Sequence, residues 1–201
     1  MALNLEKLAE YKESFLRSFP NGETFESDDY KTGERNYKTE LVEAFQSELA
    51  QYFPVLPRTD AELISLANGL LGLFFRPLAH AERKPQNLVG WRYASFARLL
   101  DDKGKIAFAR AVGALLDESA PLGERVRDFQ DELERLATGV GEKVGPAMKR
   151  SVASFFLFMF DPSLYVFVKT HEYKQSMNDL VGSHCQGEED EYERVLAFTN
   201  N

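Results

Sequence analysis

The sequence predicts a mainly α protein: a single compact multi-helix domain of about nine helices, with at most one short strand, spanning residues 1–201. Apolar residues recur at steps of three and four along nearly the whole chain, as on one face of a helix. Hydrophobic residues make up 44% of the 201, including 16 Phe, which is enough for a sizeable core. Neither a sequence repeat nor a low-complexity linker divides the chain.

Two helices are expected in the first 53 residues. The first begins near Leu5 and ends at residues 20–22, Pro-Asn-Gly, which stop a helix. The second is long and amphipathic and runs from about Asp28 to Phe53. Its apolar face consists of Tyr37, Leu41, Phe45, Leu49 and Tyr52.

The next helix opens with Thr59-Asp-Ala-Glu62, the spacing of a capping box. It is almost wholly apolar, which predicts a central position. Residues 74–85 contain two prolines and are expected to form a loop, one of the two weakest joints of the domain.

A helix capped by Asn87 is predicted to run through Leu100. Its inward residues would be Leu88, Trp91, Phe96 and Leu99. Residues 101–104 then form a turn before a helix from about Lys105 to Leu116.

The apolar residues from Leu122 to Val140 alternate steps of four and three, which predicts a helix with a narrow seam covered by a partner helix within the fold. Pro146 suits the first position of the following helix. That helix is apolar on every side over residues 155–160 and belongs in the core, and Asp161-Pro162 ends it.

The remaining residues predict one short strand and two helices. Residues 164–168 are rich in β-branched and aromatic side chains, as in a strand. Helices are expected over 170–182 and 188–198, separated by the second weak joint, residues 183–187. The last helix looks interrupted at its end, so we expect an N-terminal fragment of a longer chain.

Composition excludes several classes of protein. The net charge of −8 and the pI near 5.0 exclude a generally basic nucleic-acid binder but not a local basic patch. One Cys and three His cannot build a disulfide framework or a structural zinc cluster, so we expect neither metal nor cofactor. Without a secretory signal or an apolar span, the chain is predicted to be soluble and cytoplasmic, with no membrane partner.

Motifs for catalysis are sparse. The phosphate loop GxxxxGK[ST] is absent, as are HExxH and GxSxG, so we expect no enzyme activity from this chain. One alternative stays open: Asp161 with Glu172 and Lys174 resembles the carboxylates and lysine of a Mg²⁺-dependent nuclease. Because the surrounding segments are expected to be helical, the alternative interpretation is that Asp161 ends one helix and that Glu172 and Lys174 lie on the solvated face of the next. Cys185 follows His184 in a Gly-rich stretch that is expected to be a loop, so we interpret it as a surface thiol.

The most informative feature is a basic segment, residues 76–98, with five cations against the single acid Glu82. Aromatic side chains interleave with the cations, and such a combination contacts phosphates and stacks on bases. The other interpretation places Trp91 and Phe96 in the core, with the cations merely solvated. The predicted nucleic-acid-binding residues are Arg76, Arg83, Lys84, Asn87, Arg92 and Arg98.

Several short motifs resemble, in the same order, the N-terminal region of McrB-like AAA+ ATPases, the motor subunits of modification-dependent restriction and defence systems. They are Glu34-Arg35-Asn36-Tyr37-Lys38, Asn87 to Arg92, Phe155 to Pro162, Tyr165 to Lys169 and Asp190 to Phe198. The resemblance implies a recognition or regulatory module, with an AAA+ motor domain following in cis and a nuclease subunit as partner in trans.

Together these observations predict a non-catalytic recognition module that binds DNA for a McrB-like ATPase. A structural or oligomerisation domain, or one that binds a protein partner, is the alternative, and the acidic net charge favours it. The Mg²⁺-dependent nuclease is the third.

Overall fold

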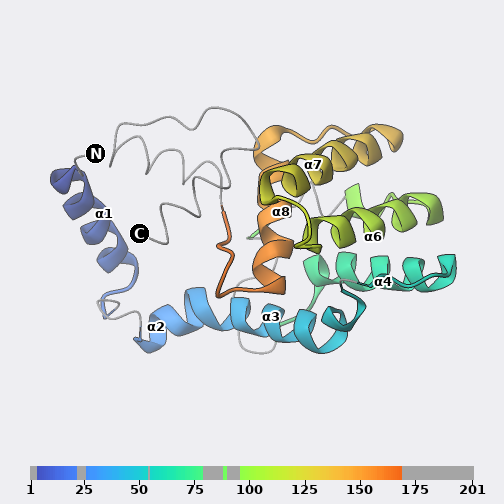
Figure 1. Cartoon of the computed structure of the whole chain (residues 1–201). Coiled ribbons are helices and arrows are strands. Elements are labelled where there is room, and N and C mark those ends of the chain that lie inside the picture. Colours follow the sequence, from blue (N-terminus) through green and yellow to red (C-terminus); the bar gives the residue numbers. More distant parts are fainter. Residues whose placement is uncertain (1–3, 22–25, 54, 79–87, 90–95, 169–201) are drawn as a thin grey trace.

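The computed structural model describes residues 4–21, 26–53, 55–78, 88–89 and 96–168. Every regular element within these ranges is helical, which confirms the predicted fold class (Figure 1). The elements are α1 (Leu5–Ser18), α2 (Asp28–Tyr30), η2 (Lys31–Arg35), α3 (Asn36–Glu48), η3 (Ala50–Tyr52), α4 (Asp60–Gly72), η4 (Leu73–Phe75), α6 (Asp102–Leu116), α7 (Leu122–Gly139) and α8 (Pro146–Phe160). The expected helices over 170–182 and 188–198 lie outside the described residues.

Helices α4, α6 and α7 pack in succession, and α8 packs against α3, α6 and α7 (Figure 1). Phe156 of α8 lies at the centre, with its ring centroid 5.3–6.3 Å from the rings of Phe74, Phe108, Phe129 and Phe155. These rings come from four different elements, and each is almost fully buried. The core position predicted for residues 155–160 is therefore confirmed for most of that stretch.

Local signals in the sequence mark several helix starts correctly. The Thr59 hydroxyl accepts a hydrogen bond from the Glu62 amide, and the Glu62 carboxylate accepts one from the Thr59 amide, so the capping box forms at α4. Pro146 occupies the first turn of α8. The predicted seam of α7 is buried against its neighbours.

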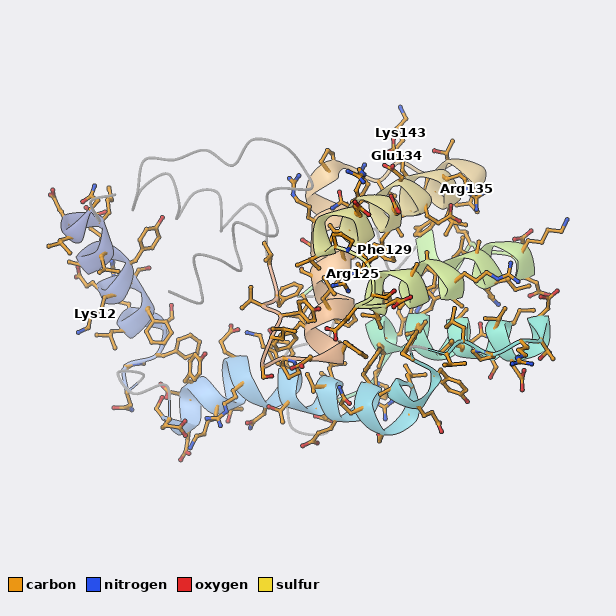
Figure 2. The ribbon with its side chains drawn as sticks, in the orientation of Figure 1. Lys12, Arg125, Phe129, Glu134, Arg135 and Lys143 are labelled. Carbon is orange, nitrogen blue, oxygen red and sulfur yellow. The ribbon has the colours of Figure 1, made fainter. Side chains whose placement is uncertain are left out.

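A buried arginine joins three parts of the chain. Arg125 donates to the carbonyl of Leu115 in the last turn of α6 and to the hydroxyl of Tyr165, which donates to Glu118. Burial is the main reason that the pKa of Tyr165 is raised. Figure 2 shows Arg125 and Phe129 on the inner side of α7, and Arg135 and Lys143 farther out.

The long helix expected over 28–53 is not uniform. Residues Lys31–Arg35 are π-helical, with hydrogen bonds one residue longer than in an α-helix. The α-helix then ends at Glu48, and a short 3₁₀ turn covers Ala50–Tyr52. The amphipathic face is nevertheless inward, since Tyr37, Leu41 and Phe45 are buried.

Three further predictions are corrected. The helix expected from Asn87 to Leu100 does not include Leu88 and Val89, which form a turn and a bend, and Leu99 faces outward with 52% exposure. Helix α6 begins at Asp102 instead of near Lys105, because the Asp101 carboxylate accepts a hydrogen bond from the Gly104 amide and caps it.

Residues 164–168 do not form a strand. At the end of this segment, the Val168 amide donates to the Ser154 hydroxyl, and the Val168 carbonyl accepts from the Ser151 hydroxyl. Both serines lie on α8, so side chains there provide backbone partners that a neighbouring strand would otherwise supply. The expected loop over 74–85 begins two residues later than predicted, at Arg76, because η4 extends to Phe75.

Helix α1 stands apart from the other described helices (Figure 1). It has no buried residue, and an aromatic trio of Phe15, Phe19 and Tyr30 joins it to α2, with ring centroids 5.2–5.7 Å apart. Among the helices described, none combines the length and apolarity needed to cross a bilayer.

Candidate functional site

Two of the six predicted nucleic-acid-binding residues, Arg76 and Arg98, lie in the described part of the chain. Arg83, Lys84, Asn87 and Arg92 lie outside it. The same holds for Trp91. Arg76 directly follows η4, the 3₁₀ turn Leu73–Phe75.

Arg76 forms a bidentate ion pair with Glu48 at the end of α3. Its two terminal nitrogens donate to the two carboxylate oxygens over 2.8 and 2.6 Å. This pairing lowers the pKa of Glu48 and raises that of Arg76. The positive charge of Arg76 is thus compensated by an acid from a different helix.

Arg98 is held differently. Its guanidinium carbon lies 4.0 Å from the centroid of the Phe75 ring, the geometry of a cation–π contact. The residue is exposed, and none of the described carboxylates lies within ion-pair distance of it. A cation–π contact uses the face of a guanidinium, and the N–H groups at its edge can still bind an anion.

Phe75 and Arg76 are consecutive, so both arginines are anchored at the same turn of the chain. A surface hollow of about 450 Å³ lies between the start of α6 and the end of α7. Its lining includes Leu99, the residue after Arg98, together with Lys103 and Arg135. Arg135 is paired with Glu132. The described site therefore offers one arginine paired with an acid and one that contacts an aromatic ring, and Leu99, the residue after Arg98, lines an open hollow.

Two residues of this site were not foreseen from the sequence. Glu48 lies 28 residues before Arg76, and Phe75 lies in another element from Arg98, so neither partnership follows a helical or strand period. The abundance of acids in the chain was the only indication that a cation of the segment would be paired.

Asp161, the described member of the possible nuclease trio, serves as a turn residue. Its carboxylate accepts hydrogen bonds from the amides of Ser163 and Leu164 and from the Ser163 hydroxyl, which lowers its pKa. Glu172 and Lys174 lie outside the described residues. Across the described ranges, no group of three or more His, Cys, Asp or Glu side chains is placed to hold a metal ion.

Comparison with known proteins adds no further information about the site. No protein-family model, curated protein or solved structure matches the chain.

Proposed function

We propose that this chain is a non-catalytic helical recognition module that binds DNA through the basic segment 76–98, as expected for the N-terminal region of a McrB-like AAA+ ATPase. The observation that carries the proposal is the stacked, exposed Arg98 on Phe75. A guanidinium held in this way loses less side-chain freedom when it binds a phosphate than a fully mobile one.

The charge balance around η4 supports a selective contact over a general attraction to DNA. Glu48 compensates Arg76, and the net charge of −8 repels the phosphate backbone elsewhere. Binding then depends on Arg98 together with Arg83, Lys84 and Arg92. Each phosphate contact releases counterions, so affinity falls steeply with salt.

The test measures duplex DNA binding by fluorescence anisotropy at several salt concentrations. Arg98→Ala should weaken binding and reduce the slope of log K against log salt by about 1. Arg110→Ala removes an exposed arginine of α6 outside the segment and is the matched control. Arg110→Ala should change the affinity and the salt slope only by the small amount expected from the loss of any one positive charge.

Glu48→Gln gives a second, opposite prediction. Removing the carboxylate releases the Arg76 guanidinium and takes away one negative charge, so duplex binding should become tighter and steeper in its salt dependence. If Arg98→Ala and Glu48→Gln both behave like Arg110→Ala, the segment does not bind DNA. The structural or protein-binding alternative then replaces this proposal.

A further inference from the structure

A second candidate site lies at the opposite end of α3 from Glu48, where the chain is π-helical. Two hollows, of about 440 and 280 Å³, adjoin this part of the helix. Arg35, Thr39 and Glu43 line both of them, so these three side chains form the boundary between the two hollows. We call the pair of hollows the α3 groove.

The smaller hollow combines apolar side chains with a polar rim of Glu34, Arg35, Lys38, Thr39 and Glu43. Tyr30 and Val42 contribute from the α2–α3 helix, and Phe158 and Pro162 contribute from the end of α8 and the residues after it. Its size suits a large apolar side chain, and its polar rim leaves the rest of such a ligand in contact with water.

The two walls are held together by a specific contact. Gln46 of α3 donates to the carbonyls of Met159 and Phe160 in the last turn of α8, over 3.1 and 2.5 Å. These carbonyls have no partners within their own helix, so the amide serves as a cap supplied by a neighbouring helix. This contact fixes the end of α8 against α3 close to the smaller hollow.

Several of the charged side chains at the groove form ion pairs with one another. Glu26 holds both Lys31 and Arg35, at 3.1 and 2.6 Å, and Glu34 holds Lys38 at 3.3 Å. Glu43 is exposed, and none of the described cations forms an ion pair with it. Four acids and three bases line the two hollows, and Glu43 is the carboxylate at the boundary between them.

The π-helical turn contributes to this arrangement. Its wider turn changes the direction of the side chains that follow, and such turns are frequent at functional sites. A Cβ at Gly33 would lie 3.1 Å from the Phe19 ring, so the helix is closely backed by the residue that follows α1.

We propose that the α3 groove binds a peptide segment of a partner protein in which a large apolar side chain is flanked by lysine or arginine. The apolar side chain enters the hollow lined by Val42 and Phe158, and a basic neighbour pairs with Glu43. The same carboxylate repels phosphate, which disfavours nucleic acid here. This site is separate from the DNA-binding segment and does not depend on it.

The probe is a fluorescein-labelled peptide, Gly-Ser-Lys-Leu-Lys-Leu-Gly-Ser, titrated with the whole chain and followed by anisotropy. We expect saturable binding below about 1 mM. Versions with Glu replacing Lys, or Ser replacing Leu, should bind more weakly. Glu43→Lys should weaken binding roughly fivefold, because attraction becomes repulsion at a partly screened site.

Two further variants complete the design. Thr39→Trp fills the boundary between the hollows without changing charge and should also weaken binding. Glu124→Lys makes the same charge reversal at an exposed position of α7 that has no ion-pair partner among the described residues, and it should bind like the wild type.

Absence of saturable binding, or an equal loss in Glu43→Lys and Glu124→Lys, overturns the proposal. If Thr39→Trp abolishes duplex DNA binding and leaves the peptide unaffected, the groove serves nucleic acid and the proposal is wrong. Absence of peptide binding does not change the expected effect of Arg98→Ala on DNA binding, so the peptide proposal can fail while the DNA proposal stands.

Discussion

Replacing Gly113 by alanine tests how closely the segment before α4 packs against α6. An alanine Cβ built at Gly113 would lie 2.5, 2.8 and 2.9 Å from Cδ1, Cγ and Cδ2 of Leu56. These distances are far below ordinary van der Waals contact. The branch carbon is included, so rotating one methyl group does not relieve the overlap.

Two opposing effects set the magnitude. Alanine is favoured over glycine inside a helix by about 1 kcal/mol. Overpacking a well-filled site costs about 1–3 kcal/mol. Gly113→Ala should therefore lower the free energy of unfolding by about 0–2 kcal/mol.

Gly72→Ala is the matched control. Gly72 has helical backbone angles and no atom within 4 Å of the added Cβ, so this change should stabilise the protein by about 0.5–1 kcal/mol. Urea unfolding with a common m value measures both changes. In a Leu56→Ala background, Gly113→Ala should become stabilising because the overlapping side chain is gone. If Gly113→Ala stabilises the wild type as much as Gly72→Ala does, the close contact with Leu56 is refuted.

Two other predictions concern contacts of α3. Gln46→Glu removes both N–H donors to the end of α8 and places a negative charge at the negative end of that helix. The free energy of unfolding, measured in urea, should therefore fall by about 1–2 kcal/mol. An unchanged stability would contradict the capping role. Arg76 holds the pKa of Glu48 below its ordinary value of 4.5, so the wild type should exceed Glu48→Gln in stability above that pH, by no more than ~1 kcal/mol for an exposed pair. This difference should disappear as pH falls through the lowered pKa, and a difference that persists in acid would contradict the assignment.

Helix boundaries were predictable where the signal is carried by neighbours in sequence. The capping box at Thr59 and the proline at residue 146 satisfy or avoid unpaired amides within one turn, so their effect does not depend on the rest of the fold. Asp101 acts in the same local way. The prediction erred there only by reading a capped helix start as a separate turn.

The candidate sites were predictable only in part. A cluster of cations over 76–98 is visible in the sequence, but the partners of the two described arginines come from other elements. The α3 groove was not foreseen, although the motif from Glu34 to Lys38 lies along it. Its second wall comes from α8, more than a hundred residues away.

The order of apolar and polar residues alone determined that the described part of this chain is mainly helical and which faces of α3, α7 and α8 turn inward, because burial of a periodic apolar stripe needs only a neighbouring element, whichever it is. Tertiary packing decided which charges meet. It placed Glu48 against Arg76 and Phe75 under Arg98, and it brought Phe158 and Val42 to the same hollow. Ion pairs, stacked cations and grooves depend on distances of a few ångströms between segments remote in sequence, and no local period specifies those distances.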